Sequence, residues 1–544
     1  MREAEKRAKS PENMWQARPI LGLLLVVGGC QKADADNVPA ASRLTPRSAE
    51  PQAAPATAPV EVSERDRVGL DGGVRAAALV SSAPGPRVYA KSLRAWIYAR
   101  PTPSSERLGY LRAGASSPTG SAAGNESCAG GWYPVVPRGF VCVGATATLD
   151  PRDPVVVLSA EHPPEFARKL PYEYGTVRNP GVVYARLPSG PELAQAEPDL
   201  ETRMGAWLSA EGEIGASYGQ EVWLGAPGVP PDPAQAWSER RSDPVPELLK
   251  RGGVVRLTDT GTSGGSDLLL GRMRPKVGYS FLHTFFDSGR RYGLTTDLAV
   301  LPTDRLRPIR GSEFRGVEIG SEIKLPFAFV RRSGARFYRW NQEKKKLEDD
   351  GEASYRLAVP LSGKRKFVRG RLHEETADGR FLSDRDASRI DPAKRMPAWG
   401  KAGERWLDVN ITKQTLVAYQ GEQPVFATLV STGEAGLDDH ENTTATKRGI
   451  FRIHTKHVSA TMSSDEVGEE FELRDVPYVQ YFEQGYALHG AYWHDRFGTP
   501  KSHGCINLSP EDARRLFFFT EPALPSGWHG VLKALTGTVV FVHQ

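Results

Sequence analysis

The C-terminal part of the chain alternates apolar and polar residues in the way that half-buried β-strands do. The alternation is clear in RWLDVNITKQTLVAY, QPVFATLVSTG and GIFRIHTK, which fall between residues 405 and 456. Successive side chains of a strand point to opposite faces, so this pattern gives each strand one apolar face. The chain closes on another apolar run, GTVVFV. We therefore expect the region after residue 404 to be mainly β.

One stretch in this region predicts a helix instead. In SPEDARRLFFFT, Ser509 is a natural N-cap, Pro510 occupies the first helical position, and Glu511 and Asp512 stand in the first turn. These residue types satisfy the first backbone amides and complement the positive end of the helix dipole. The first helical position, Pro510, lies only five residues after Cys505.

Short β-prone runs also follow Val88, namely VYA, AWIYA, RLGYL, WYPVV and GFVCVG, with turns between them. Residues 87–150 resemble bacterial Src-homology-3-like domains, which are small β-barrels; an unrelated small β-domain is the alternative. Residues 151–310 predict a mixed α/β region. Residues 311–400 predict a second barrel-like module, because FAFVRRSGARFYRW and GRFLSDRDASRI loosely echo the first. The predicted fold class is mainly β.

The first 86 residues predict export and a tether. An apolar run, Ile20–Val27, follows Arg18 and is too short to span a bilayer, so residues 1–29 read as a signal peptide. Its end, VGGC, resembles a lipobox, which makes Cys30 the lipidated residue; cleavage without lipidation is the alternative. Residues 30–86 are rich in Ala and Pro and predict a disordered tether. Gln31 favours the outer membrane facing the periplasm in a Gram-negative host, and translation starts at Met1 or Met14.

Composition narrows the class of partner. The net charge of +5 is small for 544 residues, and the basic residues are dispersed along the chain. Nucleic acid is therefore not an expected partner. Of the four cysteines, Cys128 and Cys142 lie close together and predict a disulfide, with two buried thiols as the alternative. With Cys30 assigned to the anchor, Cys505 is left as a candidate for chemistry.

The stretch LHGAYWHDRFGTPKSHGCINL supplies what a cysteine nucleophile needs. It contains two histidines as candidate bases, His489 and His503, and Gly504, which leaves room for a carbonyl to approach backbone amides. A metal site and a purely structural cysteine are the alternatives. The spacing of the histidines matches neither a CxxC nor an HExxH motif, which disfavours metal.

The pattern H-G followed by S-H-G-C-I-N resembles the L,D-transpeptidase (YkuD) catalytic domain, over about residues 404–544. The resemblance implies a YkuD-type β-sandwich with one or more short helices. It implies Cys505 as nucleophile, His489 as its proton acceptor and His503 as a loop residue that tunes the thiolate. The carbonyl of Gly490 would orient His489, and the amides of Gly504 and Cys505 would bind the oxyanion.

Five further residues are candidates for binding the substrate. They are Ser502, Asn507, Trp493, Tyr492 and Met462, the last from the segment where the family places a lid. Many members carry arginine where this chain has Asn507, whose uncharged amide cannot form an ion pair with a substrate carboxylate.

The resemblance implies attack on a peptidoglycan tetrapeptide stem, release of D-Ala, and transfer of the acyl group to an amine. The acceptor would be another stem, giving a 3→3 cross-link, or a lysine of a protein. Two alternatives stay open: an L,D-carboxypeptidase or amidase that uses water, and a non-catalytic wall-binding lipoprotein. No cofactor and no metal are expected. The remaining partner is the membrane, through the lipid on Cys30.

Overall fold

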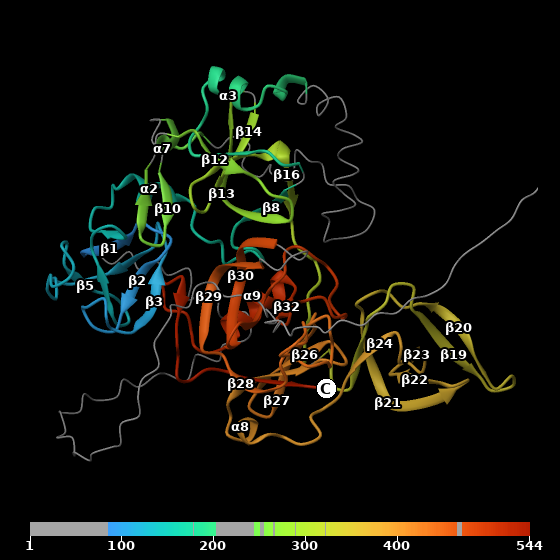
Figure 1. Cartoon of the computed structure of the whole chain (residues 1–544). Helices are drawn as coiled ribbons and strands as arrows, with labels where there is room; N and C mark the ends of the chain where they lie inside the picture. Colours follow the sequence, from blue (N-terminus) through green and yellow to red (C-terminus); the bar gives the residue numbers. More distant parts are fainter. Residues whose placement is uncertain are drawn as a thin grey trace, which may run out of the picture.

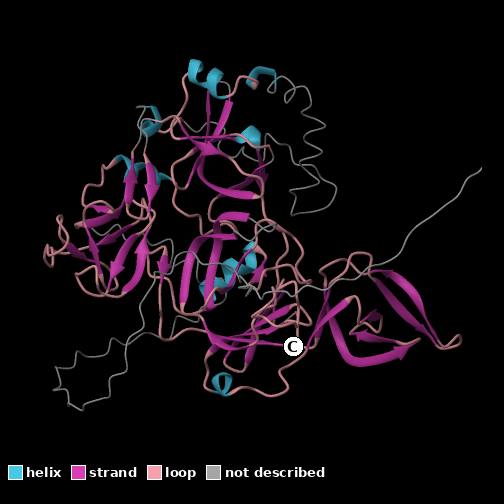
Figure 2. Cartoon of the chain, in the orientation of Figure 1, coloured by secondary structure: helices cyan, strands magenta, loops and turns pink. Residues whose placement is uncertain are grey.

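The structure, a computed structural model, describes residues 85–177, 179–202, 244–250, 255–264, 267–288, 290–320, 322–464 and 471–544. Strands dominate these ranges, as Figure 2 shows, so the predicted mainly β fold class is confirmed. Within them, no helix has the length and apolar character to cross a membrane. The predicted signal peptide, the lipidation at Cys30 and the tether lie outside the described residues.

The first module consists of seven short strands in two sheets around one core. Val88, Ile97, Leu111 and Val141 are fully buried in that core. A disulfide joins Cys128 and Cys142. The strands are β1 (Arg87–Ala90), β2 (Ala95–Tyr98), β3 (Arg107–Leu111), β4 (Ser116–Pro118), β5 (Trp132–Pro134), β6 (Phe140–Cys142) and β7 (Ala147–Thr148).

The second module combines short helices with a bent antiparallel sheet, in the order β12-β9-β15-β14-β13-β8-β16. Its helical elements are α2 (Pro154–Glu161), α3 (Gly190–Ala196), α7 (Glu247–Lys250) and η2 (Thr303–Arg305). Its strands are β8 (Glu173–Val177), β9 (Val182–Tyr184), β10 (Arg256–Thr258), β11 (Gly261–Ser263), β12 (Leu269–Arg272), β13 (Val277–Asp287), β14 (Arg290–Thr295), β15 (Val300–Pro302) and β16 (Leu306–Ile309).

The third module is a seven-stranded antiparallel sheet, in the order β20-β19-β23-β22-β21-β18-β24. It projects from the rest of the molecule at the right of Figure 1. Its strands are β18 (Phe327–Val330), β19 (Arg336–Asn341), β20 (Lys346–Glu352), β21 (Ala358–Val368), β22 (Arg371–Thr376), β23 (Phe381–Ser383) and β24 (Ala387–Ile390).

The C-terminal domain is a β-sandwich. One sheet has the order β17-β27-β26-β25-β34-β28, and the other contains β29, β30, β31 and β32. The elements are β17 (Val317–Glu318), α8 (Ala398–Lys401), β25 (Arg405–Asn410), β26 (Thr415–Gln420), β27 (Gln423–Leu429), β28 (Gly449–Arg452), β29 (Thr455–Ser464), β30 (Phe471–Glu483), β31 (Tyr486–Gly490), β32 (Ile506–Leu508), α9 (Pro510–Phe519), β33 (Gly530–Val531) and β34 (Val539–His543).

The core of the sandwich lies between the two sheets and is completed by α9. Leu407 of β25 and Leu488 of β31 are fully buried in it, together with Leu516 of α9. The helix begins as its sequence predicts, because the side chain of Ser509 accepts a hydrogen bond from the amide of Asp512 at 3.2 Å. α9 thus holds in place the two strands that flank Cys505.

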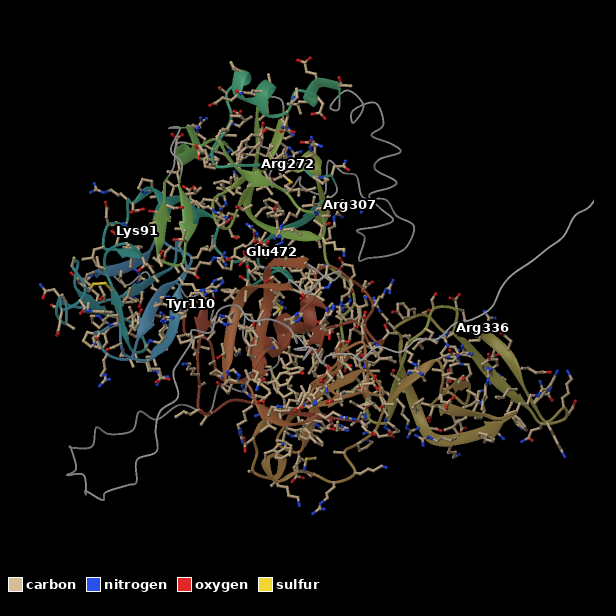
Figure 3. The ribbon with its side chains drawn as sticks, viewed as in Figure 1. Lys91, Tyr110, Arg272, Arg307, Arg336 and Glu472 are labelled. Atoms are coloured by element: carbon tan, nitrogen blue, oxygen red, sulfur yellow. A yellow bond between two sulfur atoms is a disulfide. The ribbon has the colours of Figure 1, made fainter. Side chains whose placement is uncertain are left out.

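Strand pairing links the modules to the sandwich. β13 of the second module pairs in parallel with β30, and β3 of the first module pairs with β33. Tyr110 and Glu472, labelled in Figure 3, lie at these two contacts. β17 pairs with β27, so residues 317–318, expected in the second barrel-like module, extend the sheet of the sandwich instead.

Asp475 of β30 ties these parts together in the interior. Its buried carboxylate binds the guanidinium of Arg112 from the first module, with one contact of 3.2 Å. It also accepts hydrogen bonds from the hydroxyls of Ser280, Thr296 and Ser459. Burial opposes the charged form, but Arg112 and the hydroxyl donors outweigh it and hold the pKa of Asp475 well below its ordinary value.

Candidate active site

Two parallel strands, β31 and β32, place the predicted nucleophile and base. Leu488 pairs with Ile506, and His489 with Asn507. Leu488 and Ile506 point into the sandwich core, whereas Ala487 and Cys505 belong to a second buried cluster on the opposite face. Because side chains alternate along a strand, His489, Cys505 and Asn507 all lie on that opposite face.

Cys505 sits immediately before β32 and is only 1% exposed. Its thiol donates to the carbonyl oxygen of Gly485 at 3.7 Å. The cluster around it contains Ala487 of β31 and, from the second module, Leu170 and Tyr172. The second module therefore contributes residues to the buried cluster that contains Cys505.

His489 is also buried, at 2% exposure, and its Nδ1 lies 3.4 Å from the carbonyl oxygen of Gly490. A carbonyl oxygen only accepts, so Nδ1 carries the proton and Nε2 keeps its lone pair. Burial lowers the pKa of His489 to about 4, against a smaller opposing effect of the Gly490 carbonyl. At neutral pH the imidazole is therefore uncharged and able to accept a proton.

The loop from Ser502 to Cys505 is held by its own hydrogen bonds. Ser502 Oγ donates to the carbonyl oxygen of Cys505 and accepts from the amide of Gly504 at 3.2 Å. Thr446 Oγ1 donates to the Gly504 carbonyl oxygen at 2.7 Å. Gly504 has φ +119°, and a Cβ there would lie 2.9 Å from Cε1 of Tyr486, so the position requires glycine.

This geometry differs from two expectations. The Gly504 amide, expected to bind the oxyanion, is directed at Ser502 instead. Ser502, expected to bind substrate, is a buried residue whose hydroxyl closes the loop. The physical reason is the same for both: a buried hydroxyl and a buried amide two residues apart satisfy each other.

The aromatic candidates pack beside His489. The ring centroid of Trp493 lies 5.7 Å from that of His489 and 5.2 Å from that of Tyr492. Tyr492 is fully buried, and its hydroxyl donates to the carbonyl oxygen of Arg474 at 3.2 Å. Tyr492 therefore forms part of the interior in this structure, while Trp493 is only partly buried.

The hairpin of β29 and β30 covers the cluster of Cys505. Met462 pairs with Leu473 and packs, with Phe471, against that cluster. The ring of His503 lies 5.6 Å from the ring of Phe471. Met462 belongs to this hairpin, and His503 contacts it through Phe471, although the two residues are far apart in sequence.

Two residues that the sequence did not assign to the site also contact it. His494 lies 2.9 Å, through Nε2, from the side-chain amide of Asn507. Ser431 exchanges both backbone hydrogen bonds with Asn507, each at 2.9 Å. His494 lies near the motif in the sequence, but no neighbouring residue indicates that it contacts Asn507. Ser431 belongs to no motif that would predict its contact with Asn507.

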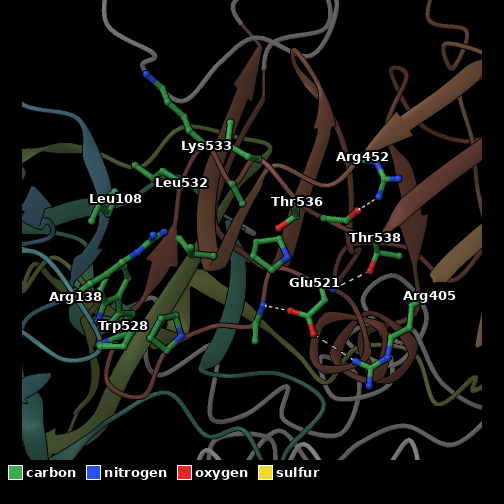
Figure 4. Close-up of a pocket in the computed structure, with 18 of the residues that line it drawn as sticks. Leu108, Arg138, Arg405, Arg452, Glu521, Trp528, Leu532, Lys533, Thr536 and Thr538 are labelled. Carbon is green, nitrogen blue, oxygen red and sulfur yellow. Dashed lines mark hydrogen bonds and ion pairs between the residues drawn. The ribbon is translucent and has the colours of Figure 1, made fainter. Parts of the chain in front are cut away.

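A separate cavity lies between the first module and the far end of the sandwich. It has a volume of about 920 Å³, and its lining includes Leu108, Arg138, Trp528 and Lys533 (Figure 4). Glu521 in its wall pairs with Arg405 at 3.6 Å. Neither Cys505 nor His489 lines this cavity, so it is distinct from the candidate active site.

Comparison with known proteins agrees with this location. Residues 404–542 match the family described as the L,D-transpeptidase catalytic domain. No curated protein matches the chain.

Several solved structures are similar to parts of the chain. An Enterococcus faecium L,D-transpeptidase is 22% identical over 26% of this chain, with a TM-score of 0.20, and the match spans only 50% of that protein. An L,D-transpeptidase from Stackebrandtia nassauensis is 27% identical over 28% of this chain and 58% of its own, with a TM-score of 0.18. An L,D-transpeptidase from Mycobacterium smegmatis is 16% identical over 40% of this chain and 82% of its own length, with a TM-score of 0.21. The family match itself supports an L,D-transpeptidase catalytic domain at residues 404–542.

Proposed function

We propose that the protein is a peptidoglycan L,D-transpeptidase with Cys505 as its nucleophile and His489 as its base. The observation that carries the proposal is the pairing of β31 with β32, which puts both side chains on one face. His489 is neutral there, with its Nε2 lone pair available, because Nδ1–H faces the carbonyl oxygen of Gly490. Burial of both residues keeps water away from the reacting sulfur.

The first half-reaction makes a thioester. The thiol proton of Cys505 passes to Nε2 of His489, and Sγ bonds to the carbonyl carbon that precedes the terminal D-Ala of a tetrapeptide stem. The carbon–nitrogen bond then breaks, and the proton on His489 goes to the nitrogen of the departing D-Ala. The enzyme keeps the acyl group as a thioester on Cys505.

The second half-reaction returns the thiol. An amine attacks the thioester carbon, the carbon–sulfur bond breaks, and the amine proton returns by way of His489 to Sγ. A second stem as acceptor gives a 3→3 cross-link, and a protein lysine gives a protein attached to the wall. If water attacks instead, the enzyme is an L,D-carboxypeptidase or amidase.

The other parts of the chain fit an enzyme that works outside the cytoplasm. The disulfide of Cys128 and Cys142 suits an oxidising compartment. We extend the proposal to a lipid anchor at Cys30, export to the periplasm, and a Src-homology-3-like fold for residues 87–150. The lipid would attach the molecule to a membrane, and the stem peptides of peptidoglycan would be its substrate.

The test is incubation of the purified protein with tetrapeptide muropeptides, followed by mass spectrometry of the products. We expect release of D-Ala and accumulation of dimers, both abolished in Cys505→Ala. Cys128→Ala together with Cys142→Ala serves as the matched control, because it replaces two cysteines that are joined in a disulfide and leaves Cys505 and its motif intact.

The same products separate the alternatives. Tripeptides without dimers would indicate a hydrolase, and binding of muropeptides without any product would indicate a non-catalytic wall-binding protein. D-Ala release that survives Cys505→Ala would rule out the assigned nucleophile.

A further inference from the structure

The inference concerns His494, which neither the sequence pattern nor the proposed mechanism uses. Its Nδ1 accepts a hydrogen bond from the backbone amide of Arg496 at 3.2 Å. A nitrogen that accepts from an amide has its lone pair in that direction, so it carries no proton. Burial also lowers the pKa of His494 to about 3, which keeps the ring neutral. The one ring proton of His494 is therefore on Nε2.

That proton decides which way the side-chain amide of Asn507 faces. The amide atom placed 2.9 Å from Nε2 of His494 is Nδ2, and a half-turn of the amide group exchanges its nitrogen with its oxygen. Two N–H groups cannot share one hydrogen bond, so the donor on Nε2 requires the carbonyl oxygen of Asn507 opposite it. The NH2 group of Asn507 then occupies the other end of the amide.

The other end of the amide, where the structure places Oδ1 and the half-turn places the NH2 group, is buried and has no hydrogen-bond partner in the part of the chain that the structure describes. Asn507 is 2% exposed, so water does not easily satisfy that end. A buried polar atom without a partner destabilises the structure, and a bound ligand that supplies the partner recovers that free energy. The arrangement leaves one N–H donor group in need of an acceptor.

The position of Asn507 places this donor beside the nucleophile. The backbone of Asn507 is fixed by its two hydrogen bonds with Ser431. Asn507 follows Cys505 by two positions on the same face of the sheet, a separation of about 6.6 Å along a strand. An acyl group on Sγ of Cys505 lies within reach of a side chain at that distance.

The site also needs such a donor. Charge develops on the oxygen of the attacked carbonyl and must be stabilised by hydrogen-bond donors. The amide of Gly504, which would be a natural donor, is engaged by Ser502 Oγ. The NH2 group of Asn507 is a donor on a residue whose backbone is fixed, and its own hydrogen-bond capacity is not used within the described residues.

We propose that His494 is a positioning residue that orients the amide of Asn507, so that its NH2 group binds a carbonyl oxygen of the acyl donor held at Cys505. The inference rests on the proposed function. It assigns to Asn507 a neutral carbonyl oxygen as its ligand, in place of the carboxylate that an arginine would bind.

The test is a double-mutant cycle on D-Ala release. His494→Leu removes the Nε2 donor, and Asn507→Ala removes the amide. We expect His494→Leu to lower kcat/KM by about tenfold or more in the wild-type background, the scale of one lost hydrogen bond to a reacting group. In the Asn507→Ala background the same change is expected to have little further effect. His494→Gln, whose amide can still donate, is expected to restore most of the activity.

Two controls separate positioning from damage to the fold. The rate of alkylation of Cys505 by iodoacetamide and the Tm are both expected to stay near their wild-type values in His494→Gln and His494→Leu. A merely structural role for His494 would lower kcat/KM by the same factor in both backgrounds, and that result would overturn the inference. Equal kcat/KM for His494→Leu and wild type would do so as well. If the wild-type protein itself releases no D-Ala, the proposed function fails, and this inference fails with it.

Discussion

His489 combines two properties that rarely occur together: it is almost completely buried, and one of its nitrogens is available as a base. Burial removes the hydration that would stabilise the charged ring, while the Gly490 carbonyl fixes the proton on Nδ1. The side chain therefore carries no charge until it takes the proton of Cys505. The resulting imidazolium lies in an apolar setting, which favours rapid return of the proton to the leaving amine.

The pKa of His489 sets the acid limit of the reaction. Its value of about 4 lies below the ordinary 6.5 because burial disfavours the charged ring. A base must be uncharged to accept a proton, so kcat/KM for D-Ala release is expected to stay level as pH falls to about 5 and to drop near pH 4. The measurement is a pH profile at each point of which Tm confirms the folded state. An acid limb centred near pH 6.5 would contradict the assignment.

At the scale of elements, strands β29 and β30 pack against the buried cluster that contains Cys505. Phe471 at the start of β30 packs against the cluster of Cys505 and beside the ring of His503. Strand β30 and the loop from Ser502 to Cys505 thus meet through aromatic rings, and under the proposed function we expect Phe471 to cover the thiol.

Phe471→Ala tests this cover. Removing the ring opens the apolar contact, so we expect iodoacetamide to alkylate Cys505 several times faster than in wild type. Phe367→Ala is the control, because Phe367 is 72% exposed on the third module and belongs to no described core cluster. An unchanged alkylation rate in Phe471→Ala would show that Phe471 does not cover the thiol.

The elements also show where sequence reasoning reaches its limit. α9 was predictable from Ser509, Pro510 and the two acids because a helix N-terminus is a local structure. The strands were predictable from their alternation. The pairing of β31 with β32 and the addition of β17 to the sandwich join segments that the pattern of one segment cannot relate.

The same limit applies within the candidate site. The family resemblance implied that Cys505, His489 and Gly504 act together, although His489 lies sixteen residues before Cys505 in the sequence. It did not show that Ser502 captures the Gly504 amide, or that His494 faces Asn507, since both depend on how the loop closes in space. The junction at Asp475 joins residues from three modules and left no sequence signal at all.

At the scale of the whole molecule, Asp475 and Arg112 hold the first two modules against the sandwich. Both side chains are largely buried, and the carboxylate also binds hydroxyls of the second module. The buried cluster that contains Cys505 also includes Leu170 and Tyr172 of that module. The junction therefore holds in place a module that contributes residues to this cluster.

Arg112→Leu leaves the Asp475 carboxylate buried without its positive partner, so we expect it to lower the free energy of unfolding by about 3–5 kcal/mol. Urea unfolding provides the measurement. Arg336→Ala, which breaks an exposed ion pair with Asp349, is the matched control and is expected to cost about 1 kcal/mol or less. Equal costs for the two variants would show that the junction is not an important contact.

Buried histidines make the stability of the whole molecule depend on pH. Burial lowers the pKa of His457 and His494 to about 3, and that of His489 to about 4, against 6.5 in the unfolded chain. The unfolded chain then binds more protons than the native state below pH 6.5, so stability falls as pH decreases from 6.5 towards 3.

Asp512 acts in the opposite direction, because burial raises its pKa to about 6 and its protonation in the native state favours folding at low pH. The loss of stability from three histidines is larger than the gain from one carboxyl, so we expect Tm to be lower at pH 4.5 than at pH 7. Differential scanning calorimetry across this range provides the measurement, and a Tm that rises on acidification would contradict the assignment of neutral, buried imidazoles.

The central claim is that Cys505 carries the acyl group of a stem peptide. The most direct measurement is the intact mass of the protein after brief incubation with a tetrapeptide muropeptide, with peptide mapping to locate the adduct. The account predicts a mass gain equal to the muropeptide less D-Ala, on Cys505, that is absent in Cys505→Ala. A protein that releases D-Ala without any adduct on Cys505, or that keeps the adduct in Cys505→Ala, would contradict it.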